Sequence, residues 1–229
     1  MDNNKKLLNI DFSHLKSYIN INMFKNVLYF SGGIIIFILG VIVYGIILNL
    51  REIPLKDEME KKGISKFRNP SIVIDRKSYT LNIYEDTIFV KSYRVNFGRS
   101  ISSPKAHFDD GATPVGNYNV CRIDSNHVYY KFIRINYPNI EDGAEALRKN
   151  LITQKDFDKL RFEYYYNECP AYNAILGGDI GIHGMGNFNF MMKNLPFVFN
   201  WTDGSVALSN ENIDEIISII TRGTKVVIK

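Results

Sequence analysis

Apolar and polar residues alternate in several short runs after residue 70, and this period of two predicts β-strands. The predicted strands cover residues 71–75, 79–84, 88–97, 118–123, 179–183 and 224–228. Short polar turns join the first three strands, which favours a β-meander. Residues 98–116 are rich in Gly, Ser, Pro and Asp, and this composition indicates a long loop after the third strand.

Two helices are expected from a period close to 3.6 residues. The first covers residues 147–166, where Thr153 can cap a helix and Asp156 stands three residues later in a capping-box position. The second lies near the C-terminus, where Ser209 or Asn210 can cap the start and Gly223 can end the helix in a left-handed conformation. Its apolar face is predicted from Ile213, Ile216, Ile217 and Ile220. The domain is therefore expected to be mainly β with helical additions, arranged as a sandwich or barrel.

The N-terminal part differs, because residues 27–50 are uncharged and apolar on all sides of a helix. About 20 helical residues cross a hydrocarbon core of roughly 30 Å, so this stretch predicts a single transmembrane anchor. A cleaved signal peptide would have a shorter apolar region with a small-residue cleavage site, and a buried core helix is seldom apolar all round. A tail at 1–26 precedes the anchor, and a charged linker at 51–69, with a short helix around 56–62, follows it. Residues 70–229 are enough for one domain with a buried core.

The net charge of +4 belongs to the segments that flank the anchor. The tail and the linker each carry +2, whereas the 160 residues that follow hold 18 basic and 18 acidic side chains. This balance argues against nucleic-acid binding, since nucleic-acid-binding domains concentrate Lys and Arg on the folded module. Apolar residues make up 45% of the chain, which excludes intrinsic disorder. Six basic residues follow the anchor directly, so the positive-inside count does not favour a cytoplasmic N-terminus.

The four histidines are His14, His107, His127 and His183. None of them lies at a metal-ligand spacing from another His, Cys or carboxylate, so no metal site is predicted. His14 precedes the anchor, and the polar context of His107 and His127 indicates solvated surface residues. His183 differs because it ends a predicted strand and glycines flank that segment, so another backbone or a substrate can approach the imidazole. A core histidine and a catalytic imidazole both fit this pattern.

A second cluster covers residues 201–210, with the sequence WTDGSVALSN. Gly204 and Ser205 at a turn would expose a hydroxyl and aim successive N–H groups at an oxyanion. A capped turn that leads into the C-terminal helix explains the same pair equally well.

Three motifs occur in one order along the chain: DGATPVGNY at 110–118, GGDIGIHG at 177–184 and WTDGSVALSN at 201–210. Together they resemble the L,D-transpeptidase (YkuD-type) catalytic domain, and in particular its murein-transpeptidase branch, over about residues 70–229. The resemblance implies a YkuD-like β-sandwich without a cofactor. It also implies a cysteine nucleophile that is served by a histidine and acts on peptidoglycan stem peptides outside the cytoplasmic membrane.

Position by position, His183 corresponds to the family's catalytic histidine and Gly204 to the glycine before the nucleophile. Ser205 corresponds to the nucleophilic cysteine, which is a departure from the family pattern. Trp201, Thr202 and Asp203 precede this pair and are the candidate substrate-binding residues. Many members have a second histidine where this chain has Asp203, and Arg or Asn where it has Ala207.

The departure at Ser205 concerns the chemistry itself. The pKa of a cysteine, about 8.5, is lowered by a neighbouring imidazolium, whereas a serine needs a base that a third group holds in place. Three explanations are open: an introduced Cys-to-Ser change, a natural member that has lost turnover, and a serine that acts slowly with His183 as its base. Cys121 and Cys169 do not replace the nucleophile. They are interpreted as structural thiols, with a disulfide between them as the alternative.

The resemblance implies a single-pass cell-membrane protein with residues 1–26 inside and 51–229 facing the cell wall. Its expected partners are peptidoglycan stem peptides and, through residues 27–50, the lipid bilayer. The expected reaction is attack on a tetrapeptide stem, formation of an acyl-enzyme and its resolution by a second stem or by water. A silent wall-binding protein and a hydrolase of the same fold are the alternatives. The oligomeric state is not predicted.

Overall fold

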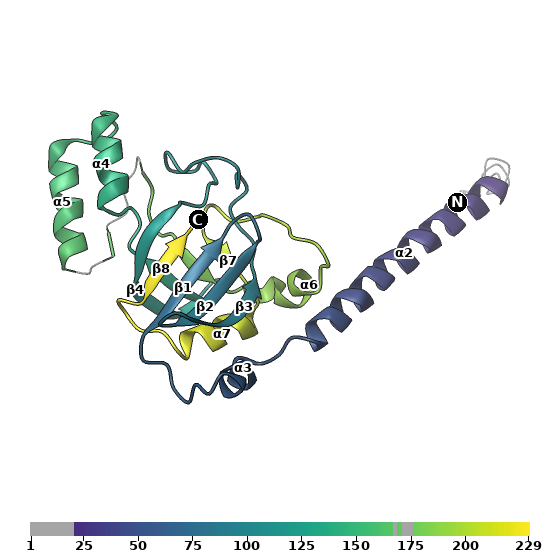
Figure 1. The fold of residues 1–229 in the computed structure, drawn as a ribbon. Helices are drawn as coiled ribbons and strands as arrows, with labels where there is room; N and C mark the ends of the chain where they lie inside the picture. The colour runs from purple at the N-terminus through teal and green to yellow at the C-terminus, as the bar shows by residue number, and fades with distance from the viewer. Residues whose placement is uncertain (1–20, 167–168, 171–175) are drawn as a thin grey trace, which may run out of the picture.

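The computed structural model describes residues 21–166, 169–170 and 176–229, so most of the predicted tail at 1–26 lies outside the described residues. Helix α2 (Ile21–Leu50) projects away from the folded domain and meets it at the helix C-terminus (Figure 1). At a rise of 1.5 Å per residue, its 30 residues extend for about 45 Å. Within the described residues, one helix is long and apolar enough to cross a membrane, and it begins at Ile21.

The domain is built on one mixed sheet of eight strands in the order β3-β2-β1-β8-β4-β5-β6-β7. The β1/β8 and β6/β7 pairs are parallel and the other neighbours are antiparallel. The strands are β1 (Pro70–Asp75), β2 (Thr80–Glu85), β3 (Ile88–Arg94), β4 (Gly116–His127), β5 (Tyr130–Ile135), β6 (Gly181–His183), β7 (Val206–Ala207) and β8 (Lys225–Ile228).

The two ends of this sheet meet. Strand β4 has 12 residues and pairs with β8 through its first half and with β5 through its second half, so the sheet folds over on itself. The Asn96 N–H donates to the Ala207 carbonyl at 2.8 Å, and the Ala207 N–H donates back at 2.9 Å. This bridge joins the segment after β3 to β7. The prediction of a mainly β domain with helical additions is therefore confirmed.

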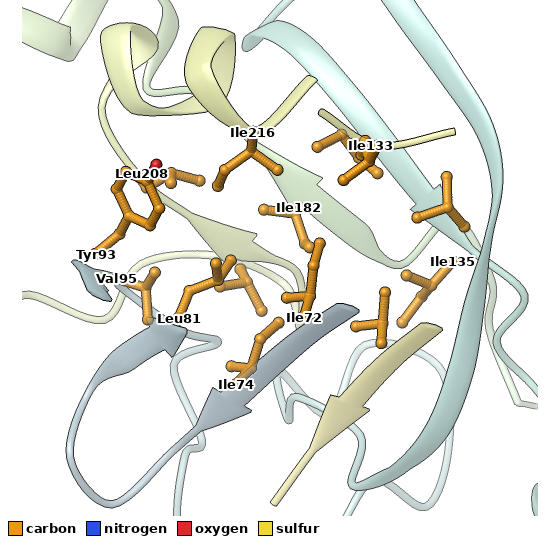
Figure 2. Close-up of a cluster of buried hydrophobic side chains, with 14 of the residues drawn as sticks. Ile72, Ile74, Leu81, Tyr93, Val95, Ile133, Ile135, Ile182, Leu208 and Ile216 are labelled. Carbon is orange, nitrogen blue, oxygen red and sulfur yellow. The ribbon is translucent and has the colours of Figure 1, made fainter. Parts of the chain in front are cut away.

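The hydrophobic core fills the space between the two halves of the sheet. Figure 2 shows Ile72 and Ile74 from β1 facing Ile133 from β5 and Ile182 from β6. Helix α7 (Asn210–Ile217) contacts β5 and β6 and adds Ile216 to the same cluster. The alternation of apolar residues in the strands thus places one face of each half on a shared core.

In the described part of the chain, the sheet is accompanied, besides α2, by α3 (Leu55–Lys61), α4 (Ile140–Arg148), α5 (Gln154–Tyr165), the 3-10 helix η1 (Gly186–Phe188), α6 (Asn189–Lys193) and α7. The predicted helix at 147–166 is wrong at its start, because the chain turns between α4 and α5. Thr153 caps α5, and the capping box with Asp156 is present as predicted. An equivalent box, formed by Asn139 and Asp142, begins α4.

Two further points differ from the sequence analysis. Strand β5 was not predicted, because Lys131 and Arg134 interrupt its alternation. Gly223 does not end the C-terminal helix, which stops at Ile217 with Ser209 as its N-cap. Instead Gly223 has a φ of 90° in the turn that leads into β8, where its lack of a side chain permits this conformation.

The predicted linker at 51–69 packs against the domain. Leu55 and Phe67 are buried in the main core cluster, and the Leu55 N–H donates to Glu215 Oε1 at 2.9 Å. The charged composition of this segment gave no indication that these two side chains are buried in the core. Helix α2 is therefore followed by a segment that is attached to the domain.

A disulfide joins Cys121 in β4 to Cys169, and it corrects the preference for two unpaired structural thiols. The bond closes a loop with a sequence separation of 48 residues that contains α4 and α5. Closing a loop of this size stabilises a fold mainly by restricting the unfolded chain.

We expect reduction of this disulfide to lower the free energy of unfolding by roughly 2–4 kcal/mol. Urea unfolding of the full chain in detergent, followed by the fluorescence of Trp201, measures the change with and without dithiothreitol. The double variant Cys121→Ser/Cys169→Ser is the control, and its midpoint should not respond to the reductant. Equal midpoints for the oxidised and reduced native chain would contradict the expectation.

Candidate active site

The strand order places the two candidate catalytic residues on neighbouring strands. His183 ends β6 and pairs with Ala207 of β7 in a parallel register, and Ser205 precedes β7 directly. Side chains two residues apart on a strand lie on the same face, so Ser205 and His183 share one face of the β6/β7 pair. The two motifs that are 22 residues apart in the sequence are thus brought together by the sheet.

The imidazole of His183 is oriented by the main chain. Its Nδ1 lies 2.7 Å from the carbonyl oxygen of Gly184, and the side chain is buried. A carbonyl only accepts hydrogen bonds, so Nδ1 carries the proton and Nε2 keeps a lone pair. The third group that a serine nucleophile requires is therefore present here as a backbone carbonyl.

Aromatic rings surround the imidazole. Tyr129 stacks on it with ring centroids 4.6 Å apart, and Phe132, its cross-strand partner, lies nearly parallel at 5.5 Å. Trp201 meets it edge-on at 5.6 Å. His127 packs against Phe132 at 4.8 Å and is half-buried, which corrects its interpretation as a solvated surface residue. His107 is exposed, as predicted.

This surrounding keeps the imidazole neutral. Burial lowers the pKa of His183 to about 4, although the hydrogen bond to Gly184 acts in the opposite direction. At neutral pH the Nε2 atom is therefore available to accept a proton. A neutral imidazole suits general-base catalysis of a hydroxyl, whereas a preformed thiolate–imidazolium pair would need a higher histidine pKa.

The depressed pKa predicts that acid destabilises the fold. Between about pH 6.5, typical of an unfolded histidine, and about 4, the unfolded chain binds the proton more readily, so stability falls as the pH falls. We expect a loss of about 2 kcal/mol from this residue between about pH 7 and about pH 4.5. Urea unfolding of the full chain at the two pH values measures it. In His183→Asn the loss should be smaller by that amount; an unchanged loss would contradict the burial argument.

Ser205 borders a cavity. The residue is 8% exposed, and its Oγ accepts a hydrogen bond from the Gly181 N–H at 3.2 Å. The cavity has a volume of about 300 Å³ and is bordered by Lys105, Phe108, Asp109, Gly177, Gly178, Asp179, Ile180, Asp203 and Ser205. A small peptide group fits a space of this size.

Ion pairs fix the walls of this cavity. Lys105 and Asp110 form a buried pair at 2.7 Å that holds the loop at 98–116. Burial alone would raise the pKa of Asp110, but hydrogen bonds from the His107 N–H, Lys105 and the Ala106 N–H outweigh it and lower the pKa to about 2. On the opposite wall, Arg134 of β5 forms an ion pair with Asp179. Arg99 holds Asp203 at 2.6 Å.

The turn before Ser205 depends on two small residues. Gly204 has a φ of 124°, and a Cβ there would lie 2.7 Å from the Ala112 carbonyl oxygen, so only glycine fits. The Gly204 N–H donates to Thr202 Oγ1 at 3.3 Å, and the Thr202 hydroxyl donates to the Ser205 carbonyl at 2.5 Å. The Gly204 N–H, one of the expected oxyanion donors, is therefore already hydrogen-bonded within the turn.

The three candidate substrate-binding residues have different positions. Thr202 is 4% exposed, its hydroxyl is used within the turn, and it is not among the residues that border the cavity, so its role in substrate binding stays a prediction. Asp203 borders the cavity. Trp201 packs on His183, and its buried Nε1–H has no hydrogen-bond acceptor in the described part of the chain. An unsatisfied donor of this kind is uncommon in folded proteins.

Sequence reasoning missed the residues that complete the site. Tyr129 and Phe132 belong to no recognisable motif. Arg134 forms an ion pair with Asp179, which depends on the pairing of β5 with β6. The signal that was available is the aromatic and basic composition of residues 127–134, HVYYKFIR, beside a histidine.

Comparison with known proteins gives the same assignment as the motifs. The family model of the YkuD L,D-transpeptidase catalytic domain matches residues 69–228. No curated protein matches the sequence.

Three solved structures illustrate the likeness. The helical cell shape determining protein Pgp2 from Campylobacter jejuni is 16% identical, with a TM-score of 0.46 over 76% of this chain and 55% of that one. Bd1075 from Bdellovibrio bacteriovorus is 18% identical, with a TM-score of 0.44 over 71% and 48% of the two chains. An L,D-transpeptidase from Mycobacterium smegmatis is 12% identical, with a TM-score of 0.40 over 70% and 58%.

The chain spans about half the length of the first two of these structures. The family model, by contrast, covers more than half of this chain and includes both His183 and Ser205. The protein therefore belongs to the YkuD L,D-transpeptidase catalytic domain family.

Proposed function

We propose that this protein is a membrane-anchored L,D-transpeptidase that acts on tetrapeptide stems of peptidoglycan. The observation that carries the proposal is the arrangement of His183 and Ser205. The imidazole is oriented by the Gly184 carbonyl through Nδ1, which leaves the lone pair on Nε2, and it shares a strand face with Ser205, which borders the cavity. The family supplies the substrate class.

In the proposed reaction, the nucleophile attacks the carbonyl carbon between the third residue of the stem and its terminal D-Ala. His183 Nε2 takes the proton of the attacking group and passes it to the amine of D-Ala as the amide bond breaks. The resulting acyl-enzyme is then attacked by an amine of a second stem, which restores the nucleophile and forms a cross-link. Water as the acceptor would give hydrolysis.

Two further groups support this assignment. The N–H groups at Gly204 and Ser205 are the proposed oxyanion donors, and the long bond from Gly204 to Thr202 would exchange for one to the substrate. The buried Trp201 Nε1–H is a donor for a substrate carbonyl next to the imidazole. Substrate binding would thereby satisfy a donor that the protein itself leaves without an acceptor.

The second candidate function is a silent protein that binds peptidoglycan without turnover. Ser205 favours it, because a serine hydroxyl does not ionise near neutral pH and replaces the more nucleophilic thiolate of the family. The cavity and its ion pairs do not depend on which atom is present at this position.

Muropeptide analysis of cells that produce this chain tests the two candidates together. New cross-links between the third residues of two stems support turnover by the native chain. Cross-links that appear only with Ser205→Cys identify the native chain as the silent form. Their absence with both proteins would refute the transpeptidase proposal.

The proposed location is the cell membrane, with the catalytic domain on the wall side. Helix α2 has the length and composition of a membrane span. The disulfide between Cys121 and Cys169 is typical of an oxidising compartment outside the cytoplasm. Protease treatment of intact spheroplasts tests the orientation, since a protected catalytic domain would contradict it.

A further inference from the structure

The segment that joins the two site residues exposes an unusual number of large apolar side chains. We name residues 186–199 the aromatic loop; it contains η1 and α6. More than half of the surface is exposed for five of its side chains, namely Phe188, Phe190, Met191, Phe197 and Phe199. Large apolar side chains that are exposed together on one short segment are typical of an interaction site.

The aromatic loop is held against the end of the membrane helix. The Asn49 side-chain amide donates to the Lys193 carbonyl and to Asn194 Oδ1, both at 2.8 Å. Gly45 lies against the main chain of Asn194, and a Cβ at this position would be 1.6 Å from the Asn194 carbonyl oxygen. Figure 1 shows α6 beside the C-terminal turns of α2, on the opposite side of the domain from α4 and α5.

These contacts fix the height of the loop relative to a bilayer. The uncharged stretch ends at Leu50, and Gly45 lies five residues earlier, about 7.5 Å along the helix. A hydrocarbon core of roughly 30 Å takes about 20 residues, so Gly45 lies near the boundary between acyl chains and headgroups. Aromatic side chains are favoured at this boundary.

The charges at the junction fit lipid headgroups. A cavity of about 300 Å³ lies between α2 and the domain, and its charged lining consists of Arg51, Arg94 and Lys193 against Glu52. Lys193 is paired with Glu211, so the two arginines against Glu52 leave one positive charge in excess. Anionic headgroups at the outer end of the helix would meet this basic excess.

We propose that the aromatic loop docks into the interface of the bilayer that α2 spans, with anionic phospholipid as its partner. The inference rests on the proposed membrane anchor. Docking would fix the orientation of the domain, because the loop begins three residues after His183 and ends six residues before Ser205. The site would then be held at a constant distance from the membrane and facing a defined part of the cell wall.

Depth-dependent fluorescence quenching tests the proposal in the full chain. Both native cysteines are in the disulfide, so one introduced cysteine can be labelled with an environment-sensitive dye. The labelled variants are Met191→Cys in the loop, Phe162→Cys on α5 as the matched exposed control, and Ile36→Cys in the anchor. Each is reconstituted into phosphatidylglycerol-containing vesicles with lipids spin-labelled either near the headgroup or near the end of the acyl chain.

The expected result is quenching at residue 191 by the headgroup-proximal label that is at least about twofold stronger than at residue 162. Quenching at 36 by the deep label with none at 191 overturns loop docking and leaves the anchor intact. Quenching at neither position overturns both. A blue-shifted but unquenched dye at 191 means that a second copy or another protein covers the loop, and it also overturns lipid docking.

Asn49→Leu gives a second test, since it keeps the helix apolar and removes the hydrogen bonds to Lys193 and Asn194. We expect the quenching at 191 to fall at least about twofold in this background while the quenching at 36 is unchanged. Equal quenching at 191 with and without this change would show that the contact with α2 does not position the loop.

Discussion

Ser205→Cys is expected to increase the rate of acyl-enzyme formation by at least about 100-fold over the native chain. A thiol ionises far more readily than a hydroxyl, and the Gly181 N–H that now donates to Ser205 Oγ would donate to the thiolate instead. A thiolate beside His183 would also raise the pKa of the imidazole from its present value of about 4, because opposite charges stabilise one another.

Intact-protein mass spectrometry with a soluble tetrapeptide stem measures this effect as the mass of the acylated protein over time. Ser218→Cys is a matched control, since it adds an exposed thiol on the far end of α7, outside the site. The gain should be confined to position 205. Equal and negligible acylation of all three proteins would count against a nucleophile at this position.

His183→Ala in the Ser205→Cys background is the second large effect, with an expected loss of kcat by about 10²–10⁴-fold. The variant removes the group that takes the proton from the nucleophile and returns it to the leaving amine. KM should change little, because the cavity that borders Ser205 does not include the imidazole. Steady-state kinetics of D-Ala release separates the two parameters.

His107→Ala is the control for this loss, since His107 is exposed in the loop at 98–116 and should be dispensable. His183→Asn keeps a planar polar group among the aromatic rings, and comparison with it separates loss of the base from loss of packing. The fluorescence of Trp201, which contacts the imidazole, reports whether each variant is folded. Retention of activity by both His183 variants would remove this residue from the mechanism.

The sequence pattern predicted the elements that follow from the local periodicity of apolar residues. Alternation located β1, β2 and β3, and the isoleucine spacing located α7, for which Ser209 is the one of the two candidate caps that the structure uses. The motif order also selected His183 and Ser205 as a pair. These features are readable because each depends on neighbouring residues or on a short motif.

Features that depend on register could not be read in this way. Phe132 contacts His183 only because β5 pairs with β6. Strand β5 itself was not predicted, because its basic residues interrupt the alternation of apolar and polar positions. Cys121 forms a disulfide with Cys169, which is 48 residues away in the sequence, so no local pattern indicates this pairing. Leu55 and Phe67 reach the core from a segment whose composition is that of a linker.

The hydrogen bond from His183 to the Gly184 carbonyl has an evolutionary consequence. Because a main-chain atom orients the imidazole, no side-chain replacement elsewhere can remove the orienting acceptor without refolding the strand. A lineage that loses turnover by exchanging the nucleophile thus keeps a histidine already aligned for catalysis. We expect such a loss to be reversible by one substitution, with the rest of the site preserved by the needs of the fold.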